Sequence, residues 1–131
     1  MAWKAVARFE IGTSHEKQHM PCQDYGHYRI LNDVIVGAVA DGAGSAKHSD
    51  VGAQLAVETV LQYLGGINEH LQKRKRCWER LSQPLSKQEA KKLFAKTTKK
   101  AIAALHKQAA NGGYSVNDLA CTLLVFVATP Q

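Results

Sequence analysis

Two β-rich runs separated by only two residues constrain the fold of this chain more than any other feature of its sequence. The runs are YGHYRIL, residues 25–31, and VIVGAVA, residues 34–40, and the intervening Asn32-Asp33 suits a tight hairpin turn. A two-residue turn fixes the antiparallel register, because a slip by one position would turn every side chain to the other face. The second run is nearly all apolar, which predicts a central strand covered on both faces.

The same register brings two carboxylates together at the open end of the hairpin. Asp24 precedes the first run and Asp41 follows the second, so the two residues are predicted to stand directly opposite each other. Opposed side chains have Cβ atoms about 4.5–5.5 Å apart, and like charges at that distance repel. The pair needs a positive partner: a divalent cation, a Lys or Arg side chain, or a shared proton. If the strands end earlier, both carboxylates fan out into water instead.

The residues after Asp41 favour a cation. Gly42 and Gly44 let the backbone turn sharply and leave a carbonyl or amide free to face a ligand. Hard oxygen ligands on a tight loop suit Mg²⁺ or Mn²⁺. A helix expected to start near Lys47 brings the positive end of its dipole beside the loop, which favours an anionic substrate, and His48 lies at that terminus.

Apolar periodicity predicts the other elements. Alternation over residues 3–11 predicts a first strand, and the apolar run over residues 118–129 predicts a last, buried strand. A helical stripe predicts a helix over residues 47–64 that is ended by Gly65-Gly66.

A second long helix is expected after Ser86, because Ser86 and Glu89 form a capping box, and it continues to about Ala110. A short helical piece is expected around residues 71–81. Together the elements predict one α+β domain over residues 1–131, with an antiparallel sheet packed against a pair of long helices. An apolar last strand needs neighbours of its own, so the domain is expected to be incomplete.

Charge is unevenly distributed along the chain. The net charge is +6, yet residues 73–107 carry twelve bases and two acids, which gives that segment +10. Lysines on the outer face of a helix explain the run better than a nucleic-acid surface, because only Trp78 and Phe94 interleave with them. The chain has no apolar run of about 20 residues and no secretory signal, so a soluble, cytoplasmic protein is expected. Reduced thiols are expected at Cys22, Cys77 and Cys121.

Three stretches of the chain resemble the metal-dependent protein serine/threonine phosphatases of type 2C. A loop ends in Gln-Asp, a strand ends in Asp-Gly-x-Gly before a helix, and a Thr-containing strand follows two helices. The pattern His-x-x-x-x-x-Pro-Cys-Gln-Asp is similar to a bacterial branch of the family. The resemblance covers essentially the whole chain but only about the N-terminal half of the family's domain. The stretches are GTSHEKQHMPCQDY (12–25), VGAVADGAGSAKHSDVGAQLAV (36–57) and DLACTLLVFVAT (118–129).

The resemblance implies a β-sandwich of two packed antiparallel sheets, flanked by helical pairs, with a two-metal centre at one end. The substrates would be phosphoproteins, from which phosphate is hydrolysed at serine and threonine. By this resemblance Asp41 would bridge two Mg²⁺ or Mn²⁺ ions, the Gly42 carbonyl would bind one of them, and Asp24 would hold metal-bound water. A metal-bound hydroxide would attack phosphorus in line while the cations stabilise the attacking and departing oxygens.

The chain departs from the family pattern at several positions. Gln23 stands where many members have Glu, and Ala43 stands where a His often follows Asp-Gly. Many members have a phosphate-binding Arg shortly before the first block, whereas this chain has none between Arg8 and Arg29. The remaining metal-binding aspartates of the family lie in the second half of its domain. The phosphate-binding candidates in this chain are Lys17, His19 and His48.

Other functions are less well supported by the residues. His15, His19 and Cys22 have a spacing that suggests zinc, but no fourth ligand is placed. The glycines around Ala43 resemble a dinucleotide loop, although Lys47 occupies the third glycine position. Cys22 in its loop is more typical of an inert thiol than of a nucleophile.

A non-catalytic role is the alternative to a phosphatase. A truncated or split relative could persist as an interaction module, by pairing its exposed sheet with a second copy or with a missing C-terminal half. Metal-dependent hydrolysis would favour the enzyme, and a stable dimer without metal dependence would favour the module.

Overall fold

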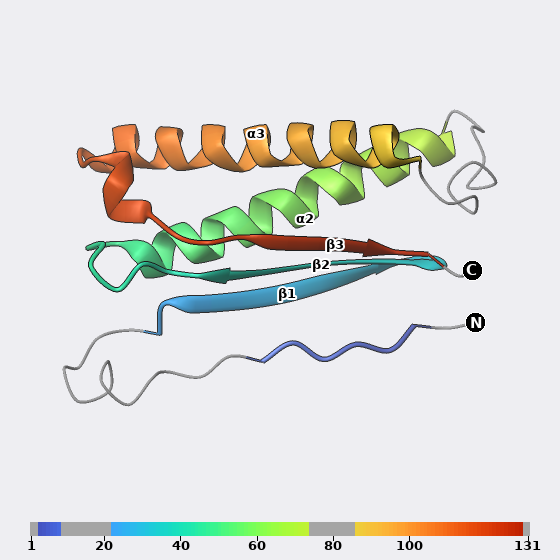
Figure 1. The fold of residues 1–131 in the computed structure, drawn as a ribbon, viewed down its shortest axis with the longest axis horizontal. Helices are drawn as coiled ribbons and strands as arrows, with labels where there is room; N and C mark the ends of the chain where they lie inside the picture. Colours follow the sequence, from blue (N-terminus) through green and yellow to red (C-terminus); the bar gives the residue numbers. More distant parts are fainter. Residues whose placement is uncertain (1–2, 9–21, 74–85, 130–131) are drawn as a thin grey trace.

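The computed structural model of the protein describes residues 3–8, 22–73 and 86–129. Within these residues, three antiparallel strands form one sheet in the order β1-β2-β3, and two long helices pack on it in a two-layer α+β fold, as the sequence predicted (Figure 1). Helix α2 packs on β1 and β2, while α3 packs against α2 and the short 3₁₀ helix η1. The elements are β1 (Asp24–Leu31), β2 (Val34–Asp41), α2 (Ser49–Lys73), α3 (Lys87–Gly112), η1 (Val116–Leu119) and β3 (Leu124–Ala128).

The hairpin β1–β2 is confirmed with its predicted register. Leu31 pairs with Val34 beside the turn, and the ladder continues to Asp24 opposite Asp41. Asn32 adopts a φ of 56°, a left-handed conformation that Asn tolerates better than most residues. The two-residue turn therefore sets the alignment of both strands over their full length.

One face of the sheet packs on the helices and forms the core. Val34, Val36, Ala38 and Ala40 of β2 alternate toward α2 and are 1–5% exposed. The neighbouring positions of the same strand point to the opposite face, because side chains alternate along a strand. The core thus lies between β2 and the apolar stripe of α2.

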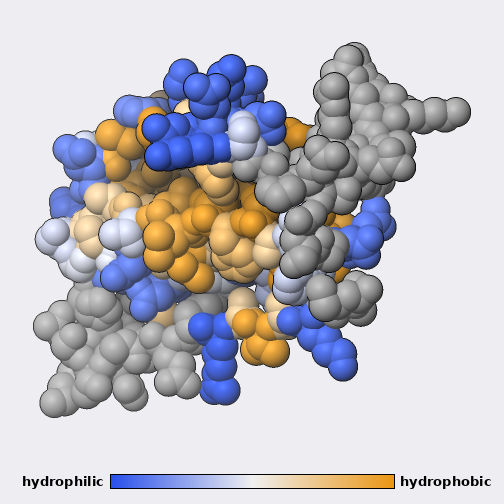
Figure 2. Space-filling view, turned by 45° about the vertical axis from the view of Figure 1, so that its right-hand side comes forward, coloured by the Kyte–Doolittle hydropathy of each residue, from blue (hydrophilic) through white to orange (hydrophobic). Residues whose placement is uncertain are grey.

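The opposite, open face of the sheet corrects two predictions. Strand β2 is central, but its second face is not covered along its whole length, because Val39 is 51% exposed. Strand β3 is not a buried strand, because Leu124 is 72% and Phe126 is 50% exposed. Within the described residues β3 lies at an edge of the sheet and buries only its helix-facing side. Figure 2 shows apolar side chains gathered in the middle of one face of the molecule, between hydrophilic ones.

Helix α2 is longer than predicted, since it runs through Gly65 and Gly66 to Lys73. An interior glycine costs a helix only about 1 kcal/mol relative to alanine, and the buried stripe of α2 outweighs that cost. Gly65 also packs beside Arg29 of β1, whose guanidinium nitrogen would lie 3.4 Å from an added Cβ. The helical piece expected at residues 71–81 is part of α2 up to Lys73, and its remainder lies outside the described residues.

Helix α3 begins and ends as the capping signals predict. The Ser86 hydroxyl accepts a 3.1 Å hydrogen bond from the Glu89 N–H, and Gly113 caps the C-terminus at a φ of 71°. The helix ends two residues later than predicted. Its lysines lie on the exposed face, as expected for residues 87–107, whereas residues 74–85 of the basic segment lie outside the described residues. These lysines are Lys87, Lys91, Lys92, Lys96, Lys99, Lys100 and Lys107.

The predicted first strand is wrong for residues 3–8, which take no part in the sheet, and residues 9–11 lie outside the described residues. Figure 1 shows the segment 3–8 running along β1, and the Trp3 indole N–H donates a 2.6 Å hydrogen bond to the Asp33 carbonyl. Alternating apolar residues indicate an extended, half-buried segment, but they do not ensure a hydrogen-bonded ladder. Within the described part of the chain, neither helix has an apolar stretch long enough to cross a bilayer.

Candidate functional site

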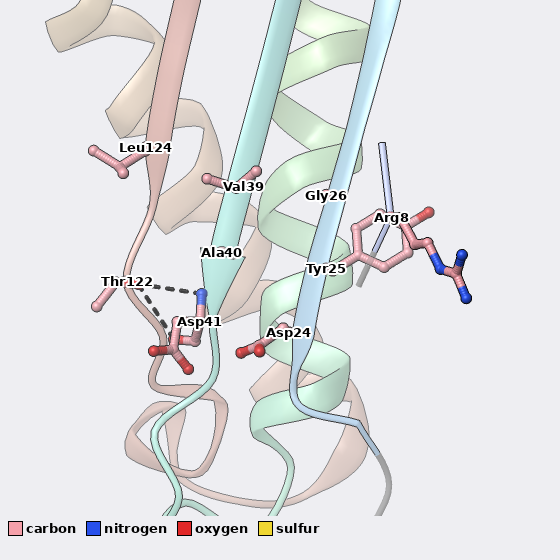
Figure 3. Close-up of a pocket in the computed structure, with 9 residues that line it drawn as sticks. All are labelled: Arg8, Asp24, Tyr25, Gly26, Val39, Ala40, Asp41, Thr122 and Leu124. Carbon is pink, nitrogen blue, oxygen red and sulfur yellow. Dashed lines mark hydrogen bonds between the residues drawn. The ribbon is translucent and has the colours of Figure 1, made fainter. Parts of the chain in front are cut away.

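Asp24 and Asp41 stand directly opposite each other at the end of β1 and β2, as predicted. The Gly42 N–H donates a 2.9 Å hydrogen bond to the Gln23 carbonyl, which makes the adjoining 23/42 pair a hydrogen-bonded one. Asp24 and Asp41 therefore form a non-hydrogen-bonded pair, the geometry in which Cα atoms approach to about 4.5 Å and side chains are closest. Both residues are exposed, and Figure 3 shows Asp24 turned toward Asp41 on the same side of the hairpin. The alternative in which the strands end before these residues is wrong.

The carboxylates border an open cavity that also receives residues from distant parts of the chain. Its lining includes Arg8 from the segment beside β1 and Thr122 from the approach to β3. Neither residue is predicted from the sequence to lie in the site. Figure 3 shows the Arg8 guanidinium on the outer side of β1, turned away from the two carboxylates. Pairing across 81 positions, as between Asp41 and Thr122, leaves no local signal in the sequence.

The loop after Asp41 is held from two sides. On the β1 side Gly42 donates to Gln23, and on the other side the Ala43 N–H donates a 2.9 Å hydrogen bond to the Ala120 carbonyl. An added Cβ on Gly42 would lie 2.7 Å from the Gln23 carbonyl oxygen and 2.9 Å from the Ser49 Cβ, so only glycine fits there. Among the backbone hydrogen bonds of the described residues, none uses the Gly42 carbonyl, which leaves this oxygen available to a ligand.

Two buried polar atoms lie next to this loop. Gln23 is 5% exposed and Ser49 is 0% exposed, and within the described residues Oε1 of Gln23 and Oγ of Ser49 have no hydrogen-bond partner. A buried polar atom without a partner costs about 1–3 kcal/mol. Gln23 also lines a second cavity together with Asp41 and Gly42, so this residue borders the candidate site.

The donor set fits a hard divalent cation. Carboxylate and carbonyl oxygens on a rigid loop are the ligands that Mg²⁺ and Mn²⁺ prefer, with waters completing the octahedron. No group of three or more His, Cys, Asp or Glu side chains that could hold a metal occurs within residues 3–8, 22–73 and 86–129. Asp24, Asp41 and the Gly42 carbonyl together suit one cation, and a second cation needs ligands from elsewhere. The zinc alternative involves His15 and His19, which lie outside the described residues.

Of the phosphate-binding candidates, His48 lies in the described part of the chain. The His48 ring packs on Tyr114, with ring centroids 4.4 Å apart, and it is not among the residues that line the two cavities beside Asp41. Lys17 and His19 lie outside the described residues.

The cysteines follow the expectation of reduced thiols where the structure describes them. Cys22 and Cys121 are free, and Cys77 lies outside the described residues. Cys121 packs against the core, and its burial raises the pKa of the thiol, which makes it a poor nucleophile. Cys22 lies in the loop, where its Sγ is 3.7 Å from the Asp24 carbonyl oxygen.

Comparisons with known proteins show which family this chain resembles. Residues 11–131 match the family model described as protein phosphatase 2C. The chain is 31% identical over 144 aligned residues to Serine/threonine-protein phosphatase 3 of Escherichia coli (strain K12), and the match covers 100% of this chain and 48% of that protein. The chain thus spans about half the length of this curated relative. No solved structure matches the chain.

Proposed function

The chain belongs to the protein phosphatase 2C family, and we propose that it forms the N-terminal, cation-binding part of a phosphatase domain. The proposed reaction is hydrolysis of phosphate monoesters on serine and threonine side chains of phosphoproteins. The name of the matched relative, a serine/threonine-protein phosphatase, supports this substrate class. The proposed location is the cytoplasm, and fractionation of cells tests it.

One observation carries the proposal: two carboxylates face each other in the closest pairing that an antiparallel sheet offers, beside a glycine whose carbonyl is available. Like charges that face each other across two strands repel, so the pairing of Asp24 with Asp41 suits a site that binds a cation. A divalent cation turns that repulsion into binding energy.

The roles proposed for the residues are those that the family resemblance implies. Asp41 would hold two Mg²⁺ or Mn²⁺ ions, and the Gly42 carbonyl would help to hold one of them. Asp24 accepts a hydrogen bond from the attacking water and so orients it toward phosphorus. When bound, the cations neutralise the phosphate and lower the pKa of the attacking water. Lys17 and His19 remain proposed phosphate-binding residues, while His48 lines neither of the two cavities beside Asp41.

The rest of the domain is proposed to come from outside the chain. The open face of the sheet exposes apolar side chains, and the matched relative is about twice as long as this chain. We propose that a second sheet, from a further segment or a partner chain, covers this face and brings the missing cation ligands. The exposed apolar residues of this face are Ile30, Val39, Leu124 and Phe126.

Cation binding and hydrolysis test the proposal together. We expect Mn²⁺ to raise the melting temperature of the protein and Asp41→Asn to abolish that rise. Hydrolysis of p-nitrophenyl phosphate and of a phosphothreonine peptide, with and without Mn²⁺, then measures catalysis. A protein whose melting temperature does not respond to millimolar Mn²⁺ or Mg²⁺ would falsify the cation-binding role.

The open face favours a second candidate function, an interaction module without catalysis. In that case the apolar face is covered by another copy of the chain, as in a closed dimer. Light scattering distinguishes the two functions: a stable dimer that forms equally in EDTA and in Mn²⁺, together with no hydrolysis, supports the module. A metal-responsive protein with Mn²⁺-dependent hydrolysis supports the phosphatase.

A further inference from the structure

In the ladder beside the candidate cation site, the side-chain hydroxyl of Thr122 accepts a hydrogen bond that a backbone carbonyl would normally accept. The isolated bridge between Gly42 and Cys121 continues the register of β2 and β3, so Thr122 stands opposite Asp41. This position of the ladder is a hydrogen-bonded one, at which the two opposed residues normally exchange two backbone N–H···O=C hydrogen bonds. Here the Thr122 N–H donates a 2.8 Å hydrogen bond to the Asp41 carbonyl, but the Asp41 N–H donates instead to the Thr122 hydroxyl, at 3.1 Å.

The hydroxyl contacts both backbone polar groups of Asp41. It accepts from the N–H, and it donates a longer bond of 3.4 Å to the carbonyl oxygen of the same residue. One side chain thereby fixes both peptide groups that flank the Asp41 Cα. The direction of the Cα–Cβ bond follows from these two peptide planes, so Thr122 fixes the direction in which the Asp41 side chain leaves the backbone.

Sheet stability alone does not account for this arrangement. Thr122 is exposed, so its hydroxyl could bond to water at little cost, and a regular carbonyl would complete the ladder equally well. Thr122 also lines both cavities that flank Asp41, as Figure 3 shows for one of them. The residue whose N–H bonds to a side chain instead of a carbonyl is therefore Asp41, which faces Asp24.

We infer that Thr122 is a positioning residue for Asp41, whose hydroxyl holds the carboxylate in its cation-binding orientation. This inference rests on the proposed cation-binding function. Residues that orient a metal ligand typically change metal affinity by 10- to 100-fold when they are replaced. A purely structural threonine would change the unfolding curve without changing affinity in the folded protein.

Mn²⁺ binding to four proteins tests the inference. Binding is measured by the electron paramagnetic resonance signal of free Mn²⁺, and folding by circular dichroism of the same samples. Thr122→Val removes the hydroxyl at nearly constant volume, and Thr122→Ser retains it. The matched control is Thr98→Val, since the exposed Thr98 donates a 2.8 Å hydrogen bond to the Phe94 carbonyl within α3 and lines neither cavity.

We expect Thr122→Val to weaken Mn²⁺ binding by about 10-fold or more while the variant remains folded. Thr122→Ser restores affinity to within about 2-fold, and Thr98→Val matches the wild type. Equal affinities of Thr122→Val and wild type overturn the inference and leave the proposed function intact. A wild type that binds no Mn²⁺ overturns both. If the valine variant does not fold, Thr122→Ala makes the same comparison without the second methyl group.

Discussion

The Tyr25 hydroxyl donates a 3.0 Å hydrogen bond to Oε1 of Glu58 and so joins the start of β1 to the middle of α2. Tyr25 follows Asp24 directly, and it lies on the helix-facing side of the sheet, where it packs against the core. The contact therefore anchors the strand end that carries one member of the carboxylate pair.

Alkaline titration tests this anchor. Burial raises the pKa of Tyr25, and the hydrogen bond to Glu58 and the charge of Glu58 raise it further. Because the folded-state pKa lies above the unfolded value of about 10, the protonated phenol stabilises the fold below pH 10, and the contribution disappears as the pH rises through the folded-state pKa. We expect Tyr25→Phe to be less stable than wild type by about 0.5 kcal/mol near pH 8, and the difference to vanish at high pH. Urea unfolding across this pH range measures it, and a constant difference would contradict the assignment.

Removing one charge of the carboxylate pair has opposite effects with and without metal. In EDTA at low salt, Asp41→Asn relieves repulsion with Asp24 and stabilises the protein by up to about 1 kcal/mol. In Mn²⁺ the wild type gains stability and the variant does not. Thermal unfolding in EDTA and in Mn²⁺ measures the difference in stability between the variant and the wild type under each condition. Asp33→Asn, at the turn end of the same hairpin, is the control and is expected to show neither effect. If Asp41→Asn is less stable than the wild type in EDTA, the two carboxylates do not repel each other as proposed.

Two glycines of α2 respond oppositely to alanine. An added Cβ on Gly52 would fall on the backbone of Leu119, whereas an added Cβ on Gly66 meets nothing within 4 Å. Gly52→Ala is expected to lose about 1–3 kcal/mol by overpacking. Gly66→Ala is expected to gain about 0.5–1 kcal/mol from helix propensity. Chemical denaturation compares the two variants, and equal changes would show that the α2–η1 contact yields easily.

Thiol labelling tests the burial of Cys121. With Cys22 and Cys77 replaced by serine, the only remaining thiol is half-buried, and its raised pKa lowers the thiolate fraction. We expect maleimide to label the folded variant more slowly than the same variant unfolded in guanidinium at the same pH. Equal rates in the two states would place Cys121 at the surface.

Local signals made the hairpin and the start of α3 predictable. The Asn32-Asp33 turn leaves only one register, and this register alone brings Asp24 opposite Asp41. Ser86 and Glu89 mark a helix start by a hydrogen bond between residues that are three positions apart. Both signals act over a few positions, and so they can be read along the sequence.

Tertiary contacts determine the features that local sequence signals did not predict. Gly65 looks like a helix end, yet packing against the sheet carries α2 past it. Leu124 and Phe126 read as core residues, although their strand lies at an edge with one face open. Arg8 and Thr122 reach the cavity from segments distant in the sequence, through contacts that no periodicity encodes. The roles of Asp24, Asp41 and Gly42 remain predictions.

The hydroxyl of Thr122 meets the backbone of Asp41 across 81 positions of sequence. On the ribosome the β1–β2 hairpin emerges first and can close within microseconds, long before Thr122 is synthesised. A nascent chain therefore presents both aspartates for several seconds without the contact that orients one of them. By the positioning role inferred for Thr122, the Asp41 carboxylate takes its final orientation only after β3 has docked on β2.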